Sequence, residues 1–240
     1  MTERTVILHY HLFKNAGTSI DGALKTGFPG RWASKEFPTV GGNNSPLIAE
    51  WIRGEPNGVA FSTHTGMGPI PELPNVDVFS LLFLRDPIDR IKSVYRFERE
   101  QKAETMGAKL AKSEDFEGYV RHRLGIAGDR QCRNFQSNRL AKFRPGESSE
   151  LDRALASLDS LSFVGFVGDF ENSLVDLAVK IRAFLPEFRV HEIPHLNRSA
   201  ANAGSSDYGL RPELLELLYE SNREDFEILY RAGFIRQLPS

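Results

Sequence analysis

The chain has 240 residues, of which 40% are apolar and 26% are charged, a composition typical of a folded protein rather than a disordered one. Its 30 basic and 32 acidic residues leave a net charge of −2, so there is no overall positive field to attract nucleic acid or an anionic membrane, and we expect neither as a partner. This length suits one α/β domain, residues 1–240.

The sequence carries no pattern typical of export. The apolar stretch from Val6 to Phe13 is short and contains His9 and His11, whereas a membrane helix needs about twenty apolar residues. Cys132 is the only cysteine, so no intrachain disulfide can form, which is usual in a reducing compartment. We therefore expect a cytoplasmic protein in which Cys132 is a buried, small apolar side chain.

Strands and helices alternate along the first part of the chain. Residues Thr5–Phe13 are rich in β-branched and aromatic side chains and predict a strand, one face of which buries both His9 and His11. A polar turn at 14–19 then leads into a short helix at Ile20–Lys25. The next expected elements are a long loop at Thr26–Pro46, a helix at Pro46–Arg53, and a strand at Gly58–Thr63 that ends at His64.

The second part begins with Val76–Leu84, a nearly continuous apolar run that predicts a buried strand of a parallel sheet. Asp86 and Pro87 then provide a helix start, and this helix extends to about Gln101. Later elements are expected as helices near 134–142, 151–158, 174–184 and from 212 onward, with one strand at 163–167. This alternation predicts an α/β fold with a central parallel sheet flanked by helices.

Two segments have the chemistry of anion sites. In the first, a strand leads through Lys14 to Gly17, Thr18 and Ser19 at a helix start, where backbone N–H groups and the helix dipole favour a phosphate. This is not the Gly-x-x-x-x-Gly-Lys-Ser/Thr loop of many nucleotide-binding proteins, because here the lysine precedes the glycine. A polar turn with a solvated lysine is the alternative.

In the second segment, Arg85 leaves the end of a buried strand, which is where ligands of open α/β sheets bind. Ser93 lies about two helical turns after Asp86 and so returns to the side of the helix start, where an arginine and a hydroxyl can grip one phosphate. Arg90 lies on another face and is expected to pair with Asp86 or Asp89. The alternatives are that Arg85 forms a capping ion pair with Asp86, or that Asp86 stands near a magnesium ion.

Taken together, the two segments resemble those of sulfotransferases that use 3′-phosphoadenosine 5′-phosphosulfate (PAPS). His11 to Ser19 looks like their 5′-phosphosulfate loop, and Arg85-Asp86-Pro87 through Ser93-Val94-Tyr95 looks like their 3′-phosphate loop. The branch similar to heparan sulfate 2-O-sulfotransferase is favoured by three further segments, namely 61–66, 134–140 (including Asn134-Phe135-Gln136) and 163–174. That branch can show a His-x-His pair, whereas this chain has Ser62 at the first position and His64 at the second.

The resemblance implies a P-loop-NTPase-like sulfotransferase fold, PAPS as co-substrate and adenosine 3′,5′-bisphosphate (PAP) as product. It assigns Lys14 to the bridging oxygen and the 5′-phosphate, and it assigns Arg85 and Ser93 to the 3′-phosphate. Arg198, in a late loop at 195–209, would add a phosphate contact. The residues expected to hold the phosphosulfate are Lys14, Asn15, Ala16, Gly17, Thr18 and Ser19. No metal is expected, since the sequence shows no metal-ligand cluster.

His64 is the candidate general base because an imidazole accepts a proton near neutral pH, and Glu36 is its rival. The acceptor implied is a hydroxyl, on a carbohydrate or a small molecule, and the oligomeric state stays open. Two other functions remain possible: a P-loop-type kinase, which predicts magnesium-dependent ATP binding, and a non-catalytic nucleotide-binding module.

Overall fold

The computed structural model describes residues 4–189 and 210–239. By its internal contacts the chain divides into two compact units, each built from two stretches of sequence: Met1–Leu84 with Arg139–Asn197, and Arg85–Asn138 with Arg198–Ser240. The expectation of a single domain over 1–240 remains a prediction. No helix among the described residues is both long enough and apolar enough to cross a membrane.

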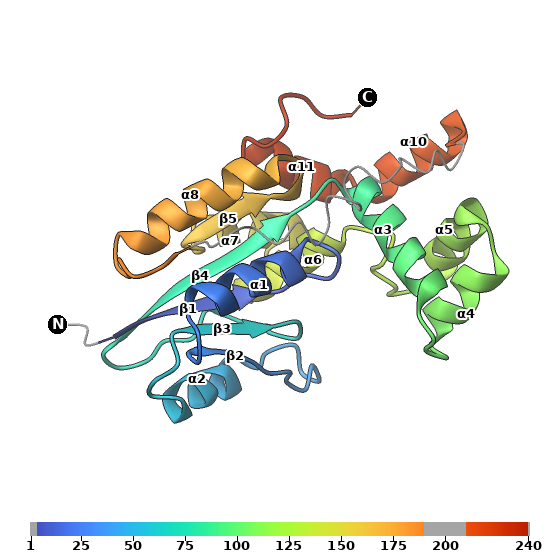
Figure 1. Cartoon of the computed structure of the whole chain (residues 1–240). Coiled ribbons are helices and arrows are strands. Elements are labelled where there is room, and N and C mark those ends of the chain that lie inside the picture. The colour runs from blue at the N-terminus through green and yellow to red at the C-terminus, as the bar shows by residue number, and fades with distance from the viewer. Residues whose placement is uncertain (1–3, 190–209, 240) are drawn as a thin grey trace. The chain divides into compact units, whose positions relative to one another are not determined.

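The first unit contains a five-stranded sheet in the order β2-β3-β1-β4-β5, and every neighbouring pair is parallel (Figure 1). Its strands are β1 (Arg4–Tyr10), β2 (Trp32–Ser34), β3 (Ala60–Thr63), β4 (Val76–Leu84) and β5 (Phe163–Phe166). Its helices are α1 (Gly17–Gly27), α2 (Ser45–Gly54), α7 (Glu150–Leu158) and α8 (Phe170–Arg182), with short 3-10 turns η1 (Ala141–Phe143) and η2 (Val167–Asp169). The predicted α/β fold with a parallel central sheet flanked by helices is confirmed.

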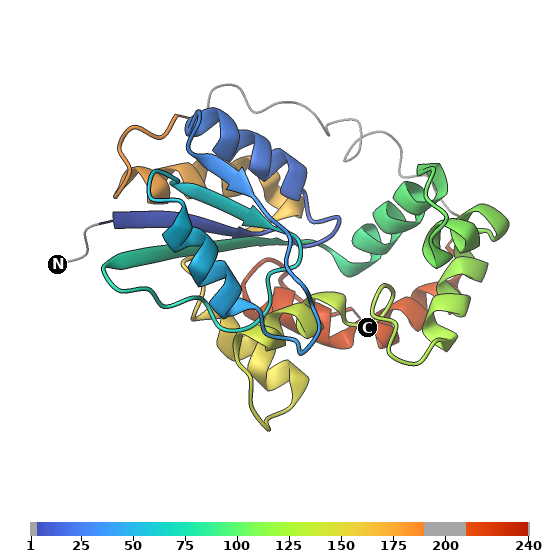
Figure 2. The same ribbon diagram turned by 90° about the horizontal axis from the view of Figure 1, so that it is seen from below.

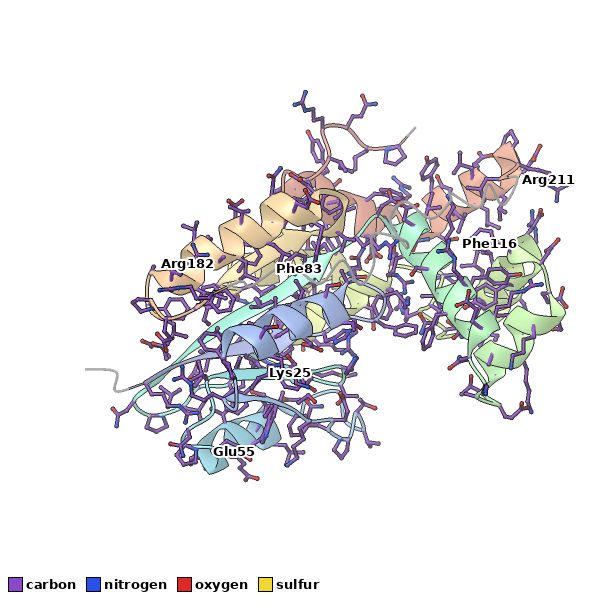
Figure 3. All side chains as sticks on the ribbon, in the orientation of Figure 1. Lys25, Glu55, Phe83, Phe116, Arg182 and Arg211 are labelled. Carbon is purple, nitrogen blue, oxygen red and sulfur yellow. The ribbon has the colours of Figure 1, made fainter. Side chains whose placement is uncertain are left out.

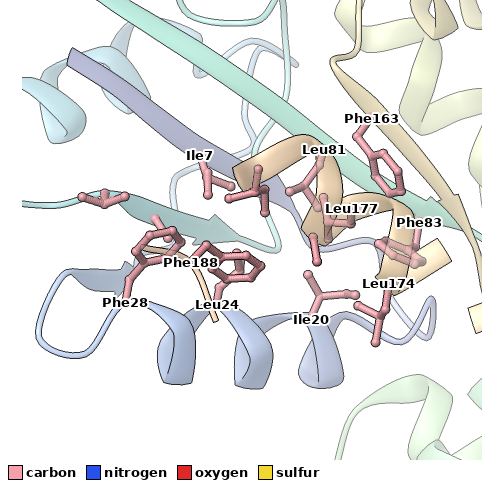
Figure 4. Close-up of a cluster of buried hydrophobic side chains, with 14 residues drawn as sticks. Ile7, Ile20, Leu24, Phe28, Leu81, Phe83, Phe163, Leu174, Leu177 and Phe188 are labelled. Atoms are coloured by element: carbon pink, nitrogen blue, oxygen red, sulfur yellow. The ribbon is translucent and has the colours of Figure 1, made fainter. Parts of the chain in front are cut away.

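Helices cover both faces of this sheet. On one face α1 and α8 pack over an apolar cluster that includes Ile7, Leu24, Phe83 and Leu177 (Figure 4). On the other face, Phe61 of β3 meets Trp51 of α2 edge-on, with ring centroids 4.9 Å apart. Figures 1 and 2 show α1 and α2 on opposite sides of the strands. Polar side chains such as Lys25, Glu55 and Arg182 lie at the surface of this unit, whereas Phe83 lies inside it (Figure 3).

The second unit is helical in its described residues, with α3 (Pro87–Glu100), α4 (Met106–Ser113), α5 (Phe116–Gly125), α10 (Pro212–Ser221), α11 (Arg223–Arg231) and most of α6 (Phe135–Leu140). Asp86 caps α3 as predicted, because its Oδ1 accepts the Asp89 N–H at 2.9 Å. A buried polar group ties α3 to α5: Glu98 accepts hydrogen bonds from the Tyr119 hydroxyl and the Arg123 guanidinium. Buried charge is thereby paired, as a folded interior requires.

Candidate active site

The loop after β1 lies at the carboxyl edge of the sheet and has an unusual backbone conformation. Lys14 and Ala16 have positive φ angles of 64° and 60°, and α1 begins at Gly17 with no side-chain cap from Ala16. Thr18 is exposed and Ser19 is buried in the first turn of the helix. A helix start without a side-chain cap presents backbone N–H groups and a positive dipole end, which suits an anion.

Asn15 anchors this loop rather than presenting its side chain to solvent. The side chain is 1% exposed, and its Nδ2 donates to the backbone oxygen of Phe83 in β4 at 2.7 Å. Packing within the chain requires glycine at position 17. A Cβ added there would lie 1.9 Å from Cδ2 and 2.2 Å from Nε2 of His11, so the imidazole occupies the space of a side chain.

The candidate base and its rival form one hydrogen-bonded pair. His64, which follows β3, brings Nδ1 within 2.6 Å of Glu36 Oε1, and its backbone N–H lies 3.1 Å from Oε2. Burial alone would raise the pKa of Glu36, but hydrogen bonds from the His64 side chain, Thr65 and the His64 backbone hold it below its ordinary value. An ionised carboxylate only accepts, so Nδ1 is the donor of this hydrogen bond and Nε2 is the ring nitrogen left to act as a base.

The register of the strands explains why these side chains meet. Ser34 of β2 pairs with Ser62 of β3, so two residues further on, past both strand ends, Glu36 stands beside His64. In β1, His9 pairs with the same Ser62, so His11 stands on the other side of His64. The His11 and His64 rings accordingly lie in contact, tilted by 32° with centroids 3.8 Å apart.

Arg139 fixes the turn that carries His64. Its Nη2 donates to the backbone oxygens of His64 at 3.0 Å and of Gly66 at 3.2 Å. Burial lowers the pKa of Arg139, and the nearby charge of Glu36 opposes this. The imidazole of His64 is therefore held by a carboxylate at one nitrogen, by a neighbouring ring on its face, and by a pinned backbone.

His9, His11 and Asp21 form a further cluster that the sequence predicted only in part. Both histidines are buried on one face, as expected. The side chain that contacts them is Asp21 of α1, whose Oδ1 lies 2.8 Å from His9 Nδ1 and whose Oδ2 lies 2.9 Å from His11 Nδ1. Burial alone would raise the pKa of Asp21, but the hydrogen bonds from His11 and His9 lower it far below the usual range. The signal was the i, i+2 spacing of the histidines on the face that α1 covers.

This cluster also has the donors of a transition-metal site, which the sequence pattern had not indicated. Two imidazoles and one carboxylate lie with their donor atoms within 4.8 Å of one another. Each carboxylate oxygen, however, already receives an N–H from a different imidazole, so hydrogen bonding satisfies the group without an ion.

In the second unit, Arg85 directly follows β4, and Ser93 lies half-buried on α3. Burial lowers the pKa of Arg85, while the charges of Asp89 and Asp86 raise it. Arg90 does not pair with either aspartate as predicted: it is fully buried, donates to Gln131, and stacks over Phe135 with its guanidinium carbon 4.2 Å from the ring centroid.

Two other predicted positions have different outcomes. Cys132 is 1% exposed, and burial raises its pKa to about 12, so it is an unreactive apolar side chain as expected. Arg198 and the loop at 195–209 lie outside the described residues, so the phosphate contact assigned to Arg198 stays a prediction.

Comparison with known proteins finds one clear relative in sequence. The chain is 36% identical over 200 residues to a protein of Archaeoglobus fulgidus described as an uncharacterized protein, covering 79% of this chain and 78% of the relative. No family model matches the chain. A crystal structure of the mouse sulfotransferase SULT7A1 complexed with PAP aligns with 98% of this chain and 90% of its own, at 11% identity and a TM-score of 0.47.

Proposed function

This chain belongs to the same protein family as the Archaeoglobus fulgidus protein, and from its own site we propose that it is a sulfotransferase that moves a sulfuryl group from PAPS to a hydroxyl acceptor. The observation that carries the proposal is the position of the His64–Glu36 pair. The His64 ring contacts the His11 ring, and the ring of His11 covers Gly17 at the start of α1. His64, the proposed base for the acceptor hydroxyl, would thus lie near the loop at 14–19, the proposed anion site. Sulfuryl transfer from an anionic donor requires these two groups to be close together.

The reaction needs one proton acceptor and one neutralised leaving group. The acceptor oxygen attacks sulfur in line, a new S–O bond forms, and the bond from sulfur to the bridging oxygen breaks. The acceptor proton passes to Nε2 of His64, while the electron pair stays on the 5′-phosphate of PAP. Lys14 and the N-terminus of α1 would offset that developing charge.

The nucleotide contacts we propose are those that the sequence resemblance implies. Lys14, Asn15, Ala16, Gly17, Thr18 and Ser19 would form the loop for the phosphosulfate, with Asn15 acting through its anchor to Phe83. Arg85 and Ser93 would hold the 3′-phosphate, and the partly desolvated guanidinium of Arg85 favours an anionic ligand. A carbohydrate hydroxyl is the proposed acceptor, an assignment supported by the sequence resemblance alone.

Calorimetric titration with PAP, with and without a chelator, tests the nucleotide assignment. We expect micromolar or tighter binding that the chelator leaves unchanged, because the proposed contacts are lysine, arginine, hydroxyl and backbone groups. Binding of ATP only with magnesium, and none of PAP, would instead indicate a kinase. Release of PAP from PAPS with a mixture of glycans then tests catalysis. A protein that binds PAP yet transfers to no acceptor would be a nucleotide-binding module.

A further inference from the structure

The side chain of Gln136 pairs with both backbone groups of Arg85. The Arg85 N–H donates to Gln136 Oε1 at 2.8 Å, and Gln136 Nε2 donates to the Arg85 carbonyl oxygen at 2.8 Å. Gln136 is fully buried. The amide thus bonds to Arg85 as a neighbouring strand would, at the point where the chain leaves β4, and satisfies two backbone groups that would otherwise be costly to bury.

Gln136 is itself held from behind by α11. Asp225, also fully buried, accepts the backbone N–H of Gln136 through Oδ2 at 3.1 Å and that of Ser137 through Oδ1 at 2.7 Å. The start of the same segment is tied to α11 as well, since the Asn134 N–H donates to Asn222 Oδ1 at 3.1 Å. The amide that grips Arg85 therefore has little freedom to shift.

This arrangement fixes the point from which the guanidinium of Arg85 extends. The backbone N–H and carbonyl of Arg85 are both taken, and the next residue, Asp86, is fixed as the cap of α3. A guanidinium that grips a phosphate with two hydrogen bonds tolerates an error of only about 0.5 Å in placement.

We propose that Gln136 is a positioning residue for Arg85, and through it for the 3′-phosphate of the bound nucleotide. The inference rests on the proposed function, since it takes a 3′-phosphorylated nucleotide as the ligand of Arg85. Gln136 acts through Arg85 and touches no ligand, so its effect should appear only with ligands that carry the 3′-phosphate.

The test compares PAP with adenosine 5′-monophosphate, which lacks the 3′-phosphate, by calorimetry on Gln136→Leu and wild-type protein. We expect Gln136→Leu to weaken PAP binding by about tenfold or more, the loss of one charged hydrogen bond, and to change monophosphate binding by less than about twofold. Gln131→Leu is the matched control, because that amide bonds to a different arginine, Arg90. It should leave both affinities unchanged.

Other outcomes separate the two proposals. Unchanged PAP affinity in Gln136→Leu, or equal losses for both nucleotides, overturns the positioning role while the sulfotransferase proposal stands. No PAP binding by the wild type rejects the proposed function, and this inference with it. If Gln136→Leu does not fold, Gln136→Asn takes its place, since it keeps an amide but is one methylene too short to bond both backbone groups of Arg85. In an Arg85→Ala background the substitution should cause no further loss of PAP affinity.

Discussion

Replacing Glu36 with glutamine should slow the reaction while leaving the fold and the nucleotide affinity intact. Glu36 Oε1 accepts from both the imidazole Nδ1 and the backbone N–H of His64, and Oε2 accepts from the same backbone N–H. A glutamine has one oxygen and one amino group, so whichever way it turns, one donor of His64 faces an N–H group. If the amino group faces Nδ1, the imidazole proton moves to Nε2, and the base is lost.

The expected sizes follow from exposure and from the role of the pair. The side chains of His64 and Glu36 are 50% and 49% exposed, so water competes for their hydrogen bond, which should contribute less than about 1 kcal/mol to the free energy of unfolding. Loss of an oriented general base lowers turnover by about a hundredfold, equivalent to about 2.7 kcal/mol of transition-state stabilisation.

The assay measures PAP release from PAPS at saturating acceptor, PAP affinity by calorimetry, and thermal unfolding. Glu50→Gln is the matched control, because Glu50 is an exposed glutamate on α2 of the same unit and should behave as wild type. Turnover of Glu36→Gln at the wild-type rate would refute the orientation of His64 by Glu36. Parallel losses of turnover and PAP affinity would instead indicate that Glu36 belongs to the nucleotide site.

Three further substitutions probe groups around the two loops. Asp21→Asn removes an ionised acceptor of His9 and His11 and should lower the free energy of unfolding, measured by urea denaturation at pH 7, by about 1.5–3 kcal/mol. Because the pKa of Asp21 in the folded protein is lowered, this difference should shrink as pH falls below about 4. Gly17→Ala places a methyl group within 1.9 Å of the His11 ring and should lower the free energy of unfolding by about 1–3 kcal/mol and reduce turnover. Turnover at the wild-type rate would show that the position of the ring does not matter. Burial raises the pKa of Asp225 from 3.8 to about 6, so its contribution to the free energy of unfolding is full below about pH 4 and is lost as pH rises through 6. Relative to Asp225→Asn, the wild type should lose about 3 kcal/mol of that free energy between about pH 4 and pH 7. Equal pH dependence of the two proteins would contradict this.

Elements with strong local signals were predictable from the sequence. The strand predicted at Val76–Leu84 is found at those residues, because a long apolar run in an α/β chain is typical of a strand buried on both faces of a parallel sheet. The helix that follows begins at Pro87 and ends at Glu100, one residue before the predicted end, since Asp86 and Pro87 carry the start signal locally. By contrast, β2 was missed inside the loop predicted at Thr26–Pro46: it has three residues at a sheet edge, too few to show a period.

Missing β2 had a direct consequence for the site. Without the pairing of Ser34 with Ser62, nothing in the sequence relates Glu36 to His64, and the two appeared as alternatives. Asp21 was missed for a similar reason: it contacts His9 and His11 only because α1 folds back over β1. The residue types of the site were visible in the sequence, whereas their partnerships depend on strand register and helix packing, which no local pattern encodes.

The backbone of the loop at 14–19 supports the proposed function independently of any resemblance. Lys14 and Ala16 adopt left-handed conformations, which cost non-glycine residues about 1–2 kcal/mol each, and neither residue type favours them. A turn selected for stability alone would carry glycine or asparagine at those positions. Here the buried Asn15 anchor to Phe83 and the His11 ring packed on Gly17 hold the strained conformation in place. Strain maintained by two separate contacts, at a helix start without a side-chain cap, supports the proposal that this loop binds an anion.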